Sequence, residues 1–125
     1  MTRTRAVCTA LVFCLALNAP AHAGVIPLPA KIVPGDGSFE IGAATEIKVP
    51  KGDADAENAA RYLVELWQRS NALALPVAVG ASATTDSTIT FQRAPGLGPE
   101  GYKLKIGPHR ITVAASSGAG LFYGA

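Results

Sequence analysis

Apolar residues recur at helical spacing between positions 54 and 70. On the opposite side of the same segment, Glu57 precedes Arg61 and Glu65 precedes Arg69 by four residues, which is the favourable order for ion pairs along a helix. The pattern predicts an amphipathic helix over about 54–70, with one apolar face and one charged face. The apolar positions are 56, 59, 60, 63, 66 and 67.

Three later segments alternate apolar and polar residues with a period of two. In 88–92 the apolar residues are Ile89 and Phe91, and segments 102–106 and 110–113 follow the same rule. Such alternation is typical of strands that bury one face and leave the other wetter, as antiparallel strands do. We therefore expect a mostly antiparallel sheet.

Shorter strands are expected earlier in the chain, at 39–41 and 45–49. Residues 75–79 read as an edge strand or a strand start, because Pro76 cannot donate a ladder hydrogen bond. Together with the helix, these strands predict an α+β fold of two layers, with the helix at about 54–70 packed on one face of the sheet.

A second helix is expected to begin near Gly118. Its apolar run, Leu121, Phe122 and Tyr123, is followed by neither a capping residue nor a cationic last turn. We expect this helix to be cut short at Ala125 as part of a longer parent protein, with the three apolar residues as its anchors on the sheet.

Residues 1–23 have the pattern of a secretory signal peptide. Arg3 and Arg5 precede an apolar stretch, and Ala21-His22-Ala23 supplies small residues at a cleavage site. The apolar stretch is shorter than the ~20 residues that a membrane-spanning helix needs. We expect an exported protein, periplasmic or extracellular, with a mature chain of residues 24–125.

Both cysteines, Cys8 and Cys14, lie inside this segment, so cleavage leaves a chain without cysteine. Lipid attachment to one of them is the alternative, but Val7 and Phe13 stand where such sites prefer a small residue. Of 11 basic and 9 acidic residues, two arginines leave with the segment, so nine of each sign remain. This balance argues against nucleic-acid binding.

Two glycine patterns suggest a phosphate-binding loop. Gly96 to Gly101 spells G-x-G-x-x-G, but a proline interrupts it and a strand follows, whereas a dinucleotide site needs a helix there. Gly118 and Gly120 do open a helix after a strand, yet the next glycine falls at 124, one position late for the motif. Close packing of helix on sheet is the favoured interpretation of that pair.

Other candidate residues also have a structural interpretation. Asp53, Asp55 and Glu57 resemble the start of a calcium loop, but the sixth and twelfth positions lack the required glycine and glutamate, so helix capping by Asp53 or Asp55 is favoured. Trp67 lies on the apolar helix face, and His109 lies in a predicted turn. The sequence predicts no catalytic, cofactor-binding or metal-binding residue, and no cofactor.

Several segments resemble one known family. At the end of the chain these are Glu-Gly-Tyr-Lys-Leu at 100–104, Ile-Thr-Val-Ala-Ala at 111–115 and Gly-Leu-Phe-Tyr-Gly at 120–124. Near its start they are Val-Ile-Pro-Leu-Pro-Ala at 25–30 and Gly-Ser-Phe at 37–39. These segments are similar to the two ends of the N-terminal domain of family-20 glycoside hydrolases, the β-N-acetylhexosaminidases.

The resemblance implies a non-catalytic domain, residues 24–125, whose partner is a (β/α)₈ catalytic barrel of the same parent chain. Family members remove terminal N-acetylhexosamine residues by substrate-assisted hydrolysis, in which the substrate's acetamido oxygen is the nucleophile and an Asp-Glu pair assists. This chain has neither an Asp-Glu dipeptide nor a barrel, so no catalytic residue is assigned and the piece alone is expected to be inactive.

Two alternatives stay open at this point. The chain can be an autonomous carbohydrate-binding or structural module, with Trp67 or Tyr102 as the sugar platform. It can also be the accessory domain of another glycosidase family, such as the α-glucuronidases. Only the barrel of the parent is expected to bind the glycan substrate. We expect this chain to bind no nucleic acid and to have no membrane anchor.

Overall fold

The computed structural model describes residues 29–80 and 85–125. The chain divides into a unit that ends at Pro34 and a compact unit, Gly35–Ala125, and each is described by itself. Residues 29–34 contain no helix or strand. The expected signal segment, 1–23, lies outside the described residues.

The compact unit contains two helices and five strands. A strand was expected at 39–41, but those residues adopt no regular structure. The other expected elements are present within a few residues of their predicted bounds. In chain order they are β1 (Glu46–Val49), α1 (Ala54–Asn71), β2 (Val77–Val79), β3 (Thr88–Arg93), β4 (Tyr102–Ile106), β5 (Arg110–Ala115) and α2 (Gly118–Gly124).

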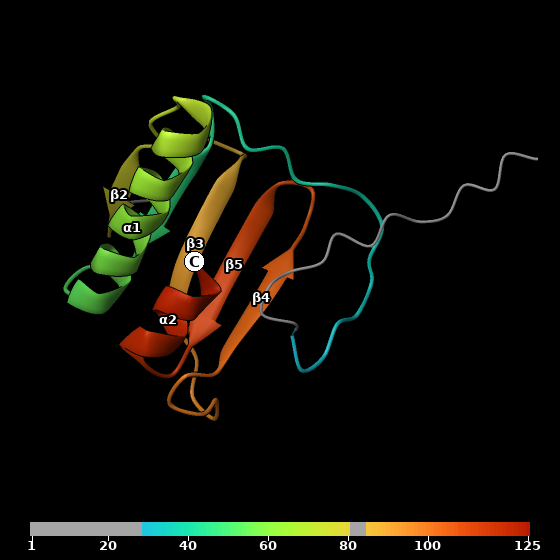
Figure 1. The fold of residues 1–125 in the computed structure, drawn as a ribbon, viewed down its shortest axis with the longest axis vertical. Helices are drawn as coiled ribbons and strands as arrows, with labels where there is room; N and C mark the ends of the chain where they lie inside the picture. The colour runs from blue at the N-terminus through green and yellow to red at the C-terminus, as the bar shows by residue number, and fades with distance from the viewer. Residues whose placement is uncertain (1–28, 81–84) are drawn as a thin grey trace, which may run out of the picture. The chain divides into compact units, whose positions relative to one another are not determined.

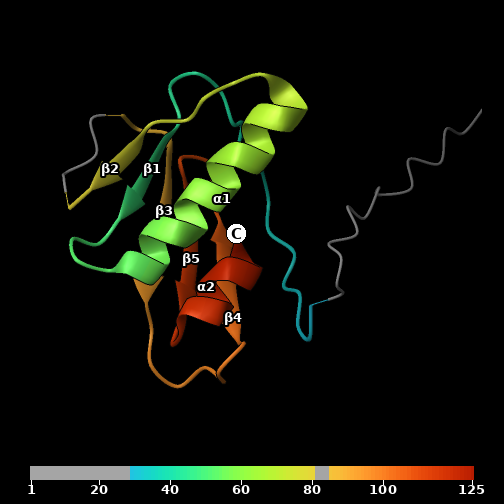
Figure 2. The same cartoon turned by 60° about the vertical axis from the view of Figure 1, so that its left-hand side comes forward.

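The five strands form one sheet in the order β2-β1-β3-β5-β4 (Figures 1 and 2). β1 pairs in parallel with β2 and with β3, and β3 pairs in parallel with β5. Only the β4–β5 hairpin is antiparallel. The expectation of a mostly antiparallel sheet was therefore wrong, because α1 connects β1 to β2 as a parallel crossover and β5 inserts between β3 and β4.

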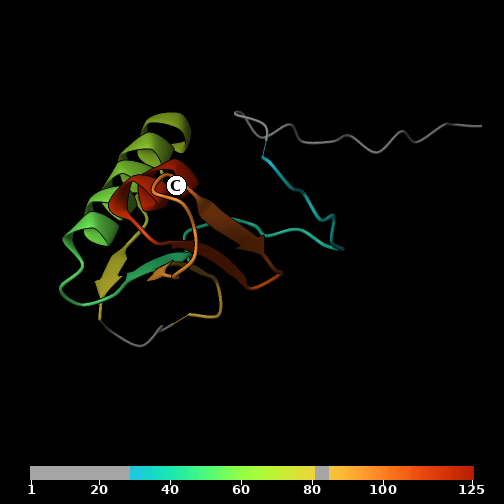
Figure 3. The same cartoon turned by 90° about the horizontal axis from the view of Figure 1, so that it is seen from below.

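Both helices lie on the same face of the sheet, as Figures 1 and 2 show. α1 contacts β1, β2 and β3, whereas α2 contacts β4, β5 and α1. Seen from below, the helices form one layer and the sheet the other (Figure 3). The predicted α+β class and the two-layer arrangement are confirmed.

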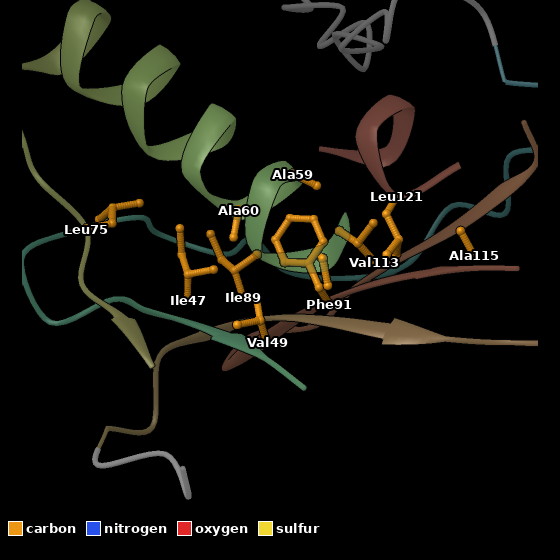
Figure 4. Close-up of a cluster of buried hydrophobic side chains, with 11 residues drawn as sticks. Ile47, Val49, Ala59, Ala60, Leu75, Ile89, Phe91, Val113, Ala115 and Leu121 are labelled. Atoms are coloured by element: carbon orange, nitrogen blue, oxygen red, sulfur yellow. The ribbon is translucent and has the colours of Figure 1, made fainter. Parts of the chain in front are cut away.

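The core lies between α1, α2 and the sheet (Figure 4). Ile47, Phe91 and Val113 point from the strands toward the helices and are at most 2% exposed. α1 faces them with Ala59 and Ala60, whose small side chains let the helix approach the sheet closely.

α1 begins and ends with local capping interactions. The Asp53 carboxylate accepts a hydrogen bond from the backbone N–H of Ala56 at 3.1 Å, so the first turn is capped as predicted. The left-handed residue at its end is Ala72, with φ 54°, although the asparagine before it is of a type more often found in that conformation. Asn71 instead stays helical, and its side-chain amide donates to the backbone carbonyl of Trp67 at 3.4 Å.

α2 differs from the expectation in its orientation. Leu121 is fully buried against the sheet, but Phe122 and Tyr123 are 45% and 57% exposed. Consecutive helical residues point about 100° apart, so three neighbouring side chains cannot all face one sheet. Of the three anchors that were predicted, only Leu121 is buried against the sheet.

Candidate functional site

Charged side chains gather where the N-terminus of α1 meets the end of β3. Arg93 forms a bidentate pair with Asp53, with Nε–Oδ2 and Nη2–Oδ1 distances of 2.7 and 2.8 Å. Its Nη2 also donates to Asp55 at 2.9 Å, and its Nη1 donates to the backbone carbonyl of Ser116 at 3.4 Å. One arginine thus joins α1, β3 and the β5–α2 connection.

This cluster is a structural clamp. The hydrogen bond from Arg93 lowers the pKa of Asp53 below its ordinary value, and the two carboxylates raise the pKa of Arg93. Both carboxylates are engaged by the guanidinium, and Glu57 pairs with Arg61 at 3.3 Å. The calcium-loop interpretation therefore finds no support, and the capping interpretation is confirmed for Asp53.

Arg93→Gln should make the stability of the domain less dependent on acid pH. Because the folded-state pKa of Asp53 is lowered, its contribution is fully present above the ordinary carboxyl pKa of about 3.9 and is lost as the pH falls through the folded-state value. At pH 7 the substitution should cost about 1–2 kcal/mol, since it removes a bidentate, partly buried pair.

Urea unfolding at pH 7 and at about pH 3 measures both effects. The matched control is Arg61→Gln, which breaks an exposed i,i+4 pair and should cost only about 0.3–0.5 kcal/mol. Equal losses for the two variants at pH 7 would contradict the clamp.

Aromatic side chains gather on the outer surface of the helices. Tyr62 on α1 and Phe122 on α2 have ring centroids 4.6 Å apart, and Tyr123 lies 6.0 Å from Phe122. Leu66, one turn beyond Tyr62, is 45% exposed. We call these four residues the aromatic face.

The glycine-rich segments have packing roles. Gly96 to Gly101 lies between β3 and β4, so it connects two strands and opens no helix. A Cβ on Gly120 would overlap the carbonyl oxygen of Gly101 and approach the Cβ of Ala115 to 2.8 Å, and a Cβ on Gly118 would lie 2.6 Å from the Asp55 carboxyl carbon. Gly120 lets α2 sit closely on β5, as the packing interpretation predicted, and Gly118 lets it approach the first turn of α1.

Three single residues noted in the sequence lie on α1, on β4 and in the β4–β5 turn. Trp67 packs against the core, and its buried indole N–H has no hydrogen-bond partner among the described residues. Tyr102 is half-buried beside Gly124. His109 is exposed in the β4–β5 turn, as expected, and borders a pocket of about 330 Å³ with Thr85, Asp86 and Arg110.

Within the part of the chain that the structure describes, no group of three or more His, Cys, Asp or Glu side chains is placed to hold a metal ion. The same residues include no helix long and apolar enough to cross a membrane. The expectation that no residue here is catalytic stays a prediction.

Residues 22–125 match the sequence profile of glycosyl hydrolase family 20, domain 2. The chain belongs to this family. No curated protein matches the chain. Solved structures of family-20 enzymes do match, and they share both sequence and fold with this domain.

The family-20 β-N-acetylhexosaminidase of Streptomyces coelicolor A3(2) is 34% identical over 80% of this chain, with a TM-score of 0.70. The N-acetyl-β-hexosaminidase of Streptomyces plicatus is 33% identical over 80% of the chain, with a TM-score of 0.66. The exo-β-N-acetylglucosaminidase of Vibrio harveyi is 28% identical over 80%, also with a TM-score of 0.66. The matched region spans 19%, 19% and 15% of those chains.

Proposed function

We propose that this chain is the non-catalytic N-terminal domain of an exported β-N-acetylhexosaminidase and that it packs against a catalytic barrel of the same parent protein. The family match and the names of the similar enzymes support the hexosaminidase assignment. The signal-peptide pattern of residues 1–23 supports export. The aromatic face is the observation that carries the docking role.

The aromatic face has the composition of a surface that is buried against another protein domain. Tyr62, Leu66, Phe122 and Tyr123 are each 39% to 57% exposed, and they form a continuous apolar area across both helices. A contiguous apolar patch of this kind marks an interaction site more often than a solvated surface. Both helices that carry these residues lie together in one layer on the sheet (Figure 2).

The geometry of the rings favours a protein partner over a sugar. The planes of Tyr62 and Phe122 are tilted by 39°, and those of Phe122 and Tyr123 by 70°, so they form no flat platform for a pyranose ring. Trp67 and Tyr102, the platform residues of the autonomous carbohydrate-binding alternative, pack against the core. An irregular, interlocking aromatic surface suits the side chains of a barrel.

The domain would contribute by supporting the barrel, while hydrolysis would be carried out by the parent's barrel residues. In the proposed parent, the acetamido oxygen of a terminal N-acetylhexosamine attacks its own anomeric centre with the help of an Asp-Glu pair. No Asp-Glu dipeptide occurs in this sequence. The acidic residues at the start of α1 are committed to the Arg93 clamp.

We expect purified residues 24–125 to release no product from an aryl N-acetyl-β-glucosaminide. Release of the aryl chromophore measures turnover, with a mock purification as the background and the full-length Streptomyces coelicolor enzyme as the positive control. Activity above background that survives further purification and follows the domain peak would overturn the non-catalytic assignment.

A further inference from the structure

The sheet face opposite the helices carries a concentration of positive charge. Strand residues alternate between the two faces, and Ile89, Leu104 and Val113 line the helix side. The intervening residues therefore point away from α1 and α2, into the side that carries no helix in the described part of the chain (Figure 3). We call this surface the open face.

Four cations and one acid lie on the strands of the open face, and Asp86 borders a pocket with Arg110 at its edge. The cations are Lys48 on β1, Lys103 and Lys105 on β4, and Arg110 on β5, while the acid is Glu46, which is only 8% exposed. The arginines Arg61, Arg69 and Arg93, by contrast, pair with acids of α1 or its cap. Positive and negative charges are nearly equal in number over the whole domain, but many of the acids lie on the helix layer. The open face is therefore positively charged.

The strand register spreads these cations across the sheet. Lys48 pairs with Thr90, Thr90 with Thr112, and Thr112 with Lys105, so one row crosses four strands with a lysine at each end. With about 4.8 Å between strands, the backbones of the two lysines stand roughly 14 Å apart. Lys103 lies two residues from Lys105 on β4, about 7 Å away.

Arg110 extends the positive area along β5. Its Nε donates to the hydroxyl of Thr88 at 3.4 Å, which lays its side chain over the neighbouring strand. The strand residues between the cations are mainly threonine, glutamine and alanine, and none carries an aromatic ring. Gln92 is exposed and Thr90 and Thr112 are half-buried, whereas Thr88 and Ala114 are buried.

We propose that the open face binds an acidic polysaccharide, a polymer of sugars that carry carboxylate groups. Charges spread over several strands suit an extended polyanion, whereas one small anion needs donors that converge on a point. The side chains of Thr90, Gln92 and Thr112, which are not buried, can bond sugar hydroxyls. The open face is separate from the aromatic face, so this binding goes beyond the proposed function and needs no catalytic barrel.

Other polyanions fit the open face less well. Single-stranded nucleic acid is usually held by aromatic side chains on which bases stack, and this face has none. An anionic membrane surface is usually entered by aromatic or large aliphatic side chains, which are also missing from this face. Both serve as comparison ligands in the test.

Affinity electrophoresis of the intact chain in gels that contain alginate tests the proposal. Retardation is expected at about 20 mM salt and should disappear at about 300 mM, because surface charges are screened within ~10 Å at 0.1 M. A gel with neutral dextran of similar length should give no retardation. Circular dichroism of each variant establishes that it is folded.

The decisive comparison removes two positive charges from either face. Lys103→Gln with Lys105→Gln should weaken alginate binding about fivefold or more, whereas Arg61→Gln with Arg69→Gln should change it less than twofold. Equal losses in the two variants, or none in the first, would overturn the proposal. Equal or tighter binding to phosphatidylglycerol vesicles or single-stranded DNA would overturn the assignment of the partner as a polysaccharide.

Discussion

Replacing Gly120 by valine should remove most of the free energy of unfolding of this domain at 25 °C. A Cβ at this position would overlap the carbonyl oxygen of Gly101 and approach the Cβ of Ala115 to 2.8 Å. Both neighbours belong to the backbone framework of the sheet and its loop, so α2 would have to move. Overpacking of this kind costs about 3 kcal/mol or more, against a total stability of ~5 kcal/mol for a small domain.

Alanine at the same position gives a sharper test of the cause. Alanine favours a helix over glycine by about 1 kcal/mol, so helix propensity alone predicts stabilisation, whereas the contact predicts a loss of about 1–3 kcal/mol. Gly42→Ala is the matched control, because a Cβ there meets nothing within 4 Å. Urea unfolding measures all three variants. A Gly120→Ala domain as stable as the wild type would show that α2 does not sit as closely on the sheet as described.

The close packing of α2 and the position of α1 could both be predicted from the sequence. Gly118 and Gly120 point to close packing because small residues after a strand are an ordinary requirement of a helix lying on a sheet. α1 was predictable for a related reason, since its periodic apolar positions and its i,i+4 charge pairs are local features. Both signals lie within a few residues of the structure that they specify.

Strand direction depends on longer-range information. Alternation in 88–92 shows that one face of the strand is buried, but a parallel strand can show the same pattern. The informative feature is the order of elements, because a helix of 18 residues between β1 and β2 favours a parallel crossover. No local sequence pattern predicts that β5 lies between β3 and β4 in the sheet.

The Arg93 clamp was missed for the same reason. Asp53 and Asp55 look like helix-capping acids on their own, and their shared partner lies about 40 residues later at the end of a strand. Two residues of the aromatic face were also placed wrongly, since Phe122 and Tyr123 were expected to pack on the sheet and are exposed instead. Helical geometry alone would have separated them from Leu121, and Tyr62 supplies their neighbour from α1.

Lengthening α2 beyond Ala125 should raise the melting temperature of the domain. The helix has seven residues and is therefore roughly 10 Å long, whereas a five-residue strand such as β4 spans about 17 Å. Between them lies an apolar groove of about 140 Å³. Leu104 and Ile106, which line it, are 39% and 60% exposed.

The expected gain follows from covering this groove. A designed amphipathic helix of about fifteen residues added after Ala125, or the residues that would follow in the proposed parent, would bury both side chains and contribute an apolar face of its own. Full burial of an aliphatic side chain contributes ~1.5–3 kcal/mol, so a gain of about 2 kcal/mol is expected. For a domain of this size that corresponds to about 8–16 °C.

A flexible Gly-Ser extension of fifteen residues is the matched control, because it adds length without an apolar face and should leave the melting temperature unchanged. Calorimetry measures the transition, and sedimentation reports whether the short chain self-associates through its uncovered groove, as we expect. The account of α2 would be wrong if the short and the helical versions melted cooperatively at the same temperature and both remained monomeric. In that case Leu121 alone would be enough to hold α2 on the sheet, and the groove beside it would be a tolerated gap.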